Sequence, residues 1–157
     1  DKYRYKHIVD AFSFIPYGTI VDEFQHIVYE NPDLTPAERD AEYLKLEKKY
    51  RPYLSFEGIP YLEKGTRWQY QMHIYESPFY YIDYCLAQCV ALGFLGLSRA
   101  DFADALDKYL AFLRATGSVS FGELVEGAGL KPPFEAGALK EIAASSAEVI
   151  REVEKKI

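Results

Sequence analysis

An all-α fold is predicted first by residues 35–50, which read TPAERDAEYLKLEKKY. Thr35 and Glu38 have the spacing of a capping box, and Pro36 stands at the first position of the helix that the box would open. The residues that follow are charged and are good helix formers. We therefore expect a helix from Pro36 to about Tyr50.

Helical periodicity extends from this stretch toward both ends of the chain, and no strand pattern of any length competes with it. Capping and breaking signals divide the chain into about seven helical segments. Pro16 is expected to end the first of them, because proline disfavours helix in the residue before it. Besides the helix at 36–50, the expected segments are 3–14, 17–30, 66–76, 77–97 with Ser77 as N-cap, 98–117 and 135–156, with one further short turn of helix at 120–127. Without repeats or low-complexity linkers, residues 1–157 are interpreted as one compact helical domain.

Residues 51–65 are predicted to form one long, aromatic-rich loop. Prolines and glycines punctuate this stretch, and the large side chains between them are Tyr53, Phe56, Ile59 and Tyr61. A loop of this length in a compact domain is often functional. The alternative is that its aromatic side chains simply attach it to the core. The sequence leaves both interpretations open.

Composition excludes several classes of function. The formal net charge is −6 and the isoelectric point is near 5.1, which disfavours a nucleic-acid surface because such surfaces neutralise phosphates. The most apolar stretch, residues 84–97, is shorter than the roughly 18 residues that a membrane helix needs. Two cysteines are too few for a disulfide framework, and the four-residue spacing of Cys85 and Cys89 in an apolar run places both on one helix face. We interpret them as reduced thiols, which indicates a reducing compartment. We expect a cytoplasmic protein that binds neither nucleic acid nor membrane.

Metal and nucleophile motifs are sparse. The chain has three histidines, His7, His26 and His73, and contains no His-Glu-x-x-His motif. Glu23 and His26 have the Glu-x-x-His spacing of di-iron bundles, but His73 and Glu76 occur in the opposite order. Such pairs are more often solvated or hydrogen-bonded polar residues than metal ligands. We expect no metal site within this chain.

Tyrosine is the unusual residue, with 14 in the chain and five of them between Tyr70 and Tyr84. At helical spacing Tyr80 and Tyr84 share a face, and Tyr81 lies about 100° away. A neutral phenol has a pKa near 10, so it can donate a hydrogen bond to a developing oxyanion through the physiological range. The competing interpretation is an aromatic stripe that packs in the core, with hydroxyls bonded internally.

A family resemblance is carried by short motifs distributed along the chain. They are IPYG at 15–18, VDEFQH at 21–26, YENP at 29–32, LEKKY at 46–50, HIYE at 73–76 and FYYIDY at 79–84. Together they resemble oligoendopeptidase F and its relatives, which are zinc metallopeptidases of the thimet-oligopeptidase superfamily. The likeness continues to residues 129–135 and so covers nearly the whole chain. It is to the C-terminal portion of the helical catalytic domain of that family.

The resemblance implies a peptidase whose metal lies elsewhere. In that family zinc is held by the two histidines of His-Glu-x-x-His and a downstream glutamate, all upstream of the portion that this chain resembles. Zinc is therefore expected in a full-length parent and not in this chain, which alone is predicted to be inactive. The implied partners are short peptide substrates and the missing N-terminal part of the catalytic domain. Apolar surface left by that missing part is expected to favour self-association.

Site residues follow from the same resemblance. His73 matches the family histidine that contacts substrate, and Tyr81 is a further substrate-binding candidate. Tyr81 is also a possible substitute for Tyr80 or Tyr84, because tyrosine spacing varies across the superfamily. Tyr80 and Tyr84 fall where catalytic, oxyanion-stabilising tyrosines recur. The alternative function is a stand-alone helical domain without catalysis, which binds peptides or is structural.

Overall fold

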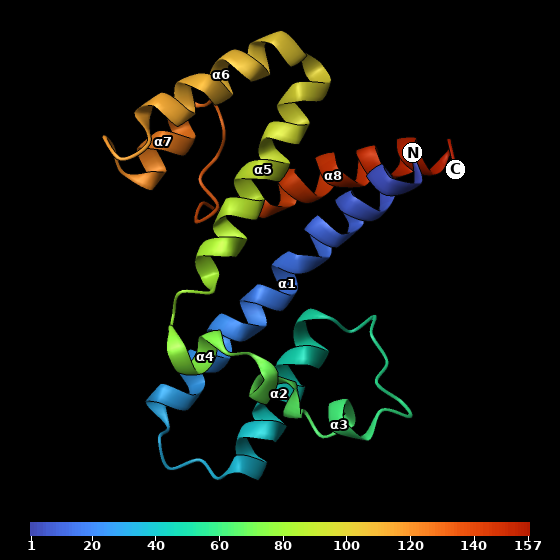
Figure 1. The fold of residues 1–157 in the computed structure, drawn as a ribbon, viewed down its shortest axis with the longest axis vertical. Coiled ribbons are helices and arrows are strands. Elements are labelled where there is room, and N and C mark those ends of the chain that lie inside the picture. The colour runs from blue at the N-terminus through green and yellow to red at the C-terminus, as the bar shows by residue number, and fades with distance from the viewer. The chain divides into compact units, whose positions relative to one another are not determined.

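The computed structural model describes all residues, 1–157, and the chain contains helices and no strand, as predicted (Figure 1). Eight α-helices and one 3-10 helix form, close to the seven expected segments. None of these helices combines the length and apolar character that crossing a membrane requires. The elements are α1 (Lys2–Glu30), α2 (Pro36–Tyr50), α3 (Pro60–Glu63), η1 (Thr66–Tyr70), α4 (His73–Glu76), α5 (Ile82–Ala100), α6 (Phe102–Ala115), α7 (Phe121–Gly127) and α8 (Ala138–Glu154).

The chain divides into two compact units. One unit is Ser13–Cys85, and the other combines Asp1–Phe12 with Leu86–Ile157. Both α1 and α5 contribute residues to each unit. The interpretation of residues 1–157 as one domain stays a prediction.

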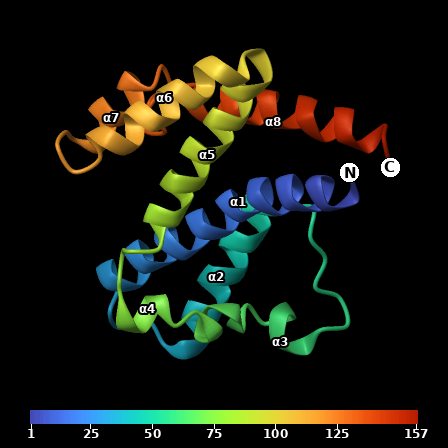
Figure 2. The same ribbon diagram turned by 45° about the horizontal axis from the view of Figure 1, so that its top comes forward.

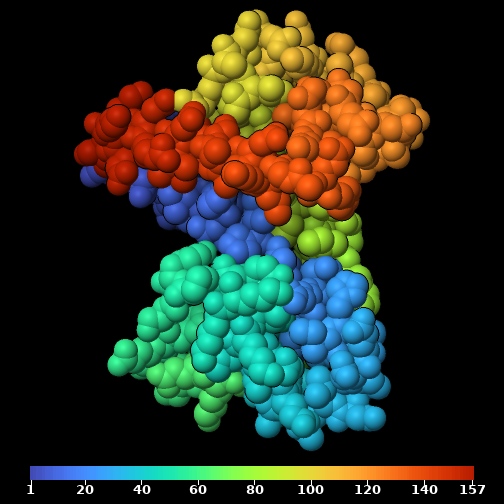
Figure 3. Space-filling model, turned by 180° about the vertical axis from the view of Figure 1, so that it is seen from behind, coloured from blue at the N-terminus to red at the C-terminus, as the bar shows by residue number.

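The core of the Ser13–Cys85 unit lies between α1, α2 and η1. Ile20, Val21 and Phe24 lie on one side of α1 and have no exposed surface. The Phe24 ring meets the buried Tyr43 ring of α2 edge-on, with 5.1 Å between centroids. Figure 3 shows α2, in cyan, lying against the second half of α1, in blue. Burial of these large apolar side chains is what holds α2 on α1.

The helix start predicted at Thr35 is confirmed. The Thr35 hydroxyl accepts a hydrogen bond from the Glu38 backbone N–H at 3.3 Å, and the Glu38 carboxylate accepts from the Thr35 N–H at 2.8 Å. The same reciprocal pattern opens α7 between Ser120 and Glu123. Local sequence was sufficient at both places because each capping box satisfies its own backbone donors.

The predicted break before Pro16 is wrong, since α1 continues through the proline to Glu30. Proline lacks an N–H, so the carbonyl of Phe12 loses its helical donor. Burial of Ile20, Val21 and Phe24 on the helix beyond the proline offsets this loss. The limit between the two compact units falls at the same place, after Phe12.

The predicted helix start at Ser77 is also wrong. Residues 77–81 form turns, and α5 begins at Ile82. Phe79 has a φ of 62°, in the left-handed region, which no right-handed helix accommodates. Likewise, the expected helix over 66–76 is divided into η1 and α4, and the helix expected from Ser98 begins at Phe102 because Asp101 is its N-cap.

The loop predicted at residues 51–65 is present and contains one short helix, α3. Tyr53 and Tyr61 are 63% and 46% exposed, so these two rings do not attach the loop to the core. A cavity of about 290 Å³ lies between the loop and α2. The loop ends at Gly65, whose φ is +80° and where a Cβ would lie 2.1 Å from the Asp40 carbonyl oxygen. Only glycine fits there.

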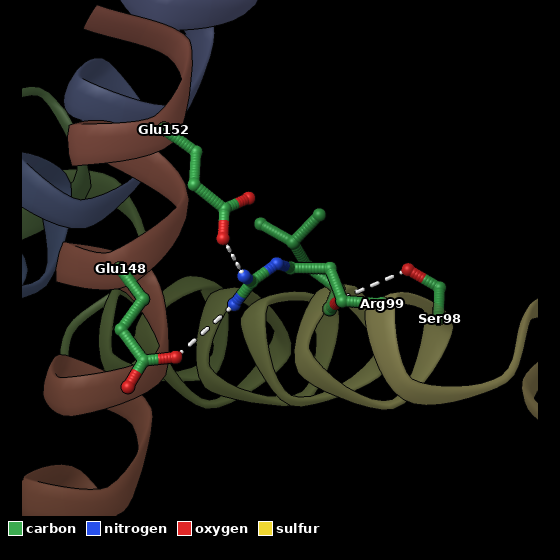
Figure 4. Close-up of polar contacts among 5 residues, drawn as sticks. Ser98, Arg99, Glu148 and Glu152 are labelled. Carbon is green, nitrogen blue, oxygen red and sulfur yellow. Dashed lines mark hydrogen bonds and ion pairs between the residues drawn. The ribbon is translucent and has the colours of Figure 1, made fainter. Parts of the chain in front are cut away.

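The second unit has a smaller apolar core, built from the first turns of α1 and from α8. Ile8, Val149 and Val153 are buried together, and Leu95 of α5 packs against them. Arg99 of α5 forms ion pairs with Glu148 and Glu152, which lie one turn apart on α8 (Figure 4). Helix α7 lies beside α6 (Figure 2).

Candidate active site: a histidine and tyrosine cluster

The structure brings all four predicted site residues into one cluster within the Ser13–Cys85 unit. We call His73, Tyr80, Tyr81 and Tyr84 the His-Tyr cluster. The His73 ring lies 4.9 Å from Tyr81 and 5.7 Å from Tyr84 between centroids, and Tyr84 lies 5.4 Å from both Tyr80 and Tyr81. The interplanar angles run from 70° to 90°, the edge-to-face arrangement that aromatic rings prefer.

The three tyrosines differ in exposure. Tyr80 and Tyr84 are 49% and 41% exposed, whereas Tyr81 is 9% exposed. The two exposed phenols are therefore accessible to a bound molecule. Tyr81 lies beneath them, between His73 and the Tyr17 ring of α1, which meets it edge-on at 6.0 Å.

A turn held by a buried glutamine directly precedes Tyr80 and Tyr81 and fixes the backbone that carries them. Gln25 has no exposed surface, and its Oε1 accepts a hydrogen bond from the Phe79 N–H at 2.8 Å. Its Nε2 donates to the Val21 carbonyl at 3.0 Å. The Phe79 ring packs against His26 and Tyr29, with centroids 4.9 and 5.0 Å away. These contacts hold Phe79 at its positive φ, a conformation that is strained for a bulky residue.

The close approach of α1 to the start of α5 also fixes the position of the cluster. A Cβ on Gly18 would lie 2.0 Å from the Cys85 Sγ, so only glycine allows this contact. The Cys85 thiol donates to the Ile15 carbonyl at 3.7 Å. Tyr81 precedes Cys85 by four residues, and the same approach brings its ring against α1.

Two consecutive hydrogen bonds connect Tyr17 of α1 to His73 through Gln71. The Tyr17 hydroxyl donates to Gln71 Oε1 at 2.6 Å, and Gln71 Nε2 lies 2.7 Å from His73 Nδ1. The guanidinium groups of Arg51 and Arg67 lie 5.1 and 4.8 Å from the centre of the Tyr17 ring, within cation–π range.

The sequence does not distinguish these supporting residues from their neighbours. Gln71 stands only two positions before His73, but no motif distinguishes it from the neighbouring Gln69. Tyr17 is 54 residues from Gln71, and its contact with Gln71 depends on packing that no spacing rule reveals. Gln25 was one of several polar residues on α1, and only its complete burial singles it out.

Burial keeps two of the phenols neutral. It raises the pKa of Tyr81 to about 12, and the neighbouring Tyr17 and Cys85 add to the effect. Partial burial and the adjacent Tyr80 phenol also raise the pKa of Tyr84. A neutral phenol is a hydrogen-bond donor, so the cluster can stabilise negative charge on a carbonyl oxygen without carrying a charge itself.

The residues of this chain do not form a zinc site. No group of three His, Cys, Asp or Glu side chains is placed to hold a metal ion. Glu23, considered with His26 as a metal pair, instead bonds Lys49 and Tyr50, while His26 lies 3.5 Å from Asp22. Cys85 and Cys89 are buried and form no disulfide, and burial raises the pKa of the Cys89 thiol.

Comparison with known proteins agrees with this architecture. A family model described as Peptidase family M3 matches residues 1–144. A solved structure assigned as an oligoendopeptidase F is 48% identical with a TM-score of 0.89, and PZ peptidase A, solved with an inhibitor, is 46% identical with a TM-score of 0.88. A third, assigned as an oligoendopeptidase F from Bacillus anthracis, is 39% identical with a TM-score of 0.76. No match is found among curated proteins.

The matches cover nearly all of this chain but little of the solved structures. The first two cover 96% of this chain and 27% of theirs, and the third covers 97% and 24%. The chain therefore spans about a quarter of the length of these three structures.

Proposed function

Because this chain belongs to peptidase family M3, we propose that it is part of a zinc-dependent oligoendopeptidase, a cytoplasmic hydrolase that cleaves short peptides. Its contribution is the His-Tyr cluster, which lines one wall of the substrate cleft. His73 contacts the peptide, and Tyr81 reaches it only through the 9% of its surface that is exposed. Tyr80 and Tyr84 stabilise the oxyanion that forms when the peptide carbonyl is attacked.

One observation carries this proposal. Tyr80 and Tyr84 expose nearly half of their surface while their rings are held edge-on to each other, and Tyr84 is held in the same way against Tyr81 and His73. Donors that are already fixed in place stabilise a transition state without the cost of ordering them during the reaction. A purely structural aromatic cluster would instead bury these side chains in the core.

Zinc and its ligands are proposed to come from a part of the protein outside this chain. The chain has no His-Glu-x-x-His motif, and its side chains form no site that fits zinc. Alone, it is proposed to be inactive, and the missing part of the catalytic domain is its expected partner. An open reading frame that continues upstream of Asp1 through His-Glu-x-x-His supports this; a start codon directly before Asp1 contradicts it.

The roles of the two tyrosines are tested in the full-length enzyme by Tyr80→Phe and Tyr84→Phe. Loss of an oxyanion donor should lower kcat by about 10²- to 10³-fold, because the interaction is made mainly in the transition state. Zinc content should stay unchanged, which separates this loss from metal loss. Tyr70→Phe is the control, since Tyr70 is 85% exposed and lies outside the cluster. Turnover at the wild-type rate in both cluster variants would rule out the proposed role.

A further inference from the structure

We propose that Tyr17 and Gln71 fix His73 in the tautomer that carries its proton on Nε2. His73 then presents an N–H donor, and not a lone pair, to whatever binds at the His-Tyr cluster. The use of that donor in catalysis rests on the proposed function, but the tautomer itself does not.

The direction of the hydrogen bonds decides the tautomer. A side-chain amide has an oxygen that only accepts and a nitrogen that only donates. Gln71 Oε1 is occupied by the Tyr17 hydroxyl, a phenol that donates to it at 2.6 Å. In this orientation of the amide, Gln71 Nε2 faces His73 Nδ1, at 2.7 Å. Since that nitrogen donates, Nδ1 must accept, and the single proton of a neutral imidazole is left on Nε2.

Tyr17 is held in place for this hydrogen bond because its ring is contacted from several sides. Arg51 and Arg67 place guanidinium groups over it, and the Tyr81 ring meets it edge-on. Arg51 is itself fixed by a two-point ion pair with Glu47, in which Nε donates to Oε2 at 2.8 Å. Both partners of that pair are more than nine-tenths buried. A buried pair with this geometry cannot move without leaving a charge unpaired.

The other ring nitrogen is available to a ligand. His73 is half-buried, and the structure gives its Nε2 no hydrogen-bond partner within the chain. Tyr81 and Tyr84 flank the ring. The group that completes this arrangement is a hydrogen-bond acceptor, and the carbonyl oxygen of a bound peptide has that chemistry. Gln71 and Tyr17 would act as positioning residues, because they contact His73 and not the ligand.

The tautomer can be read directly by nitrogen-15 NMR of histidine-labelled protein, which has only His7, His26 and His73 to assign. The measurement is made at alkaline pH, so that the two tautomers of the neutral ring are the states compared. We expect His73 Nε2 to be protonated and Nδ1 to be unprotonated. A proton on Nδ1, a rapid mixture of tautomers, or a doubly protonated ring at that pH would overturn the proposal.

Gln71→Glu is the decisive variant, because glutamate can still accept from Tyr17 but cannot donate to Nδ1. The proton should move to Nδ1, where it donates to the new carboxylate. Tyr17→Phe should instead produce a mixture of tautomers, because the amide is then free to rotate. Gln88→Glu, which adds the same charge on α5 outside this chain of bonds, should leave His73 unchanged. A Gln71→Glu spectrum identical to wild type contradicts the proposal even if Tyr17→Phe fails to fold.

Kinetics in the full-length enzyme separate this proposal from the proposed function. If His73 donates to the substrate, Gln71→Glu should lower kcat/KM by about tenfold, the usual loss for one hydrogen bond. A reversed tautomer with unchanged kinetics would uphold the role of Gln71 and refute the use of His73 in the reaction. An unchanged tautomer with lowered activity would refute the role of Gln71 in setting the tautomer.

Discussion

At the scale of single residues, burial of Tyr81 makes the stability of the fold depend on pH. Its pKa is raised to about 12, whereas tyrosine in an unfolded chain titrates near 10. The folded state therefore favours the neutral phenol, and the stability this provides is fully present below about pH 10. It is lost as the pH rises toward about 12, because the unfolded chain releases its proton first. Burial raises the pKa of Tyr43 as well, which adds to the same trend.

We expect the free energy of unfolding to fall as the pH rises above about 10, and to fall less steeply in Tyr81→Phe. Urea unfolding at a series of pH values measures both slopes. Tyr70→Phe, at an exposed position, is the control. Equal slopes in the wild type and in Tyr81→Phe would show that Tyr81 does not carry the effect.

Tyr43 offers a second prediction at this scale. Its side chain has no exposed surface, and its hydroxyl has no hydrogen-bond partner. A buried, unpaired hydroxyl costs about 1–3 kcal/mol, so Tyr43→Phe should stabilise the protein while keeping the ring contact with Phe24. Tyr17→Phe is the matched comparison, because it removes a hydroxyl that is bonded, and it should destabilise. Thermal unfolding of both variants measures the difference; a clear loss of stability in Tyr43→Phe would contradict the argument.

At the scale of elements, local signals predicted the helix starts that are capped by residues close in sequence. The capping boxes at Thr35 and Ser120 gave correct starts because donor and acceptor lie three residues apart. The starts at Ser77 and after Pro16 were wrong because they depend on distant residues. Gln25 holds the Phe79 turn from 54 positions away, and buried apolar residues carry α1 through the proline. Neither effect leaves a local pattern in the sequence.

The contact between α1 and α5 is tested by Gly18→Ala. Its new Cβ would lie 2.0 Å from Cys85 Sγ, so the helices must separate, at a cost of about 1–3 kcal/mol. Cys85→Ala removes that sulfur and leaves Tyr81 carbons at 3.7 Å, an ordinary contact, so the double variant should recover stability. Chemical unfolding of the four proteins in this cycle measures the coupling.

Gly122→Ala on α7 is the control for this substitution. An added Cβ there meets nothing within 4 Å, and alanine is the better helix former. We expect it to be neutral or stabilising. If Cys85→Ala fails to rescue Gly18→Ala, the close approach of sulfur and glycine is not what limits the packing.

At the scale of the whole molecule, the site was predictable in part. The resemblance selected His73, Tyr80, Tyr81 and Tyr84, and the structure places them together, although their roles stay predictions. The residues that orient them were not predictable, because Tyr17 reaches the cluster only through the folded arrangement of α1 against α5. Motifs identify groups that do chemistry more readily than groups that hold them in position.

The exposed face of α6 bears on how the isolated chain behaves. Phe102 is 69% exposed and Leu113 is 49% exposed, and the apolar residues between them at helical spacing are Leu106, Tyr109 and Leu110. We call these five residues the α6 stripe. Large contiguous apolar surfaces are unusual on a monomer and commonly mark interaction sites. Since this chain spans only 27% of the first two solved structures it matches, a second copy is the surface available to cover the stripe when the chain is alone.

We therefore expect the isolated chain to self-associate as its concentration rises, and Leu106→Glu with Leu113→Lys to reduce this association. Both substitutions place charge at exposed positions, so they oppose burial of the stripe without disturbing the core. Light scattering over a concentration series measures the change in mass. Ile157→Glu is the control, because it removes an exposed apolar side chain outside the stripe. A mass that stays monomeric at every concentration, or association unchanged in the double variant, would show that the stripe does not drive contact between copies.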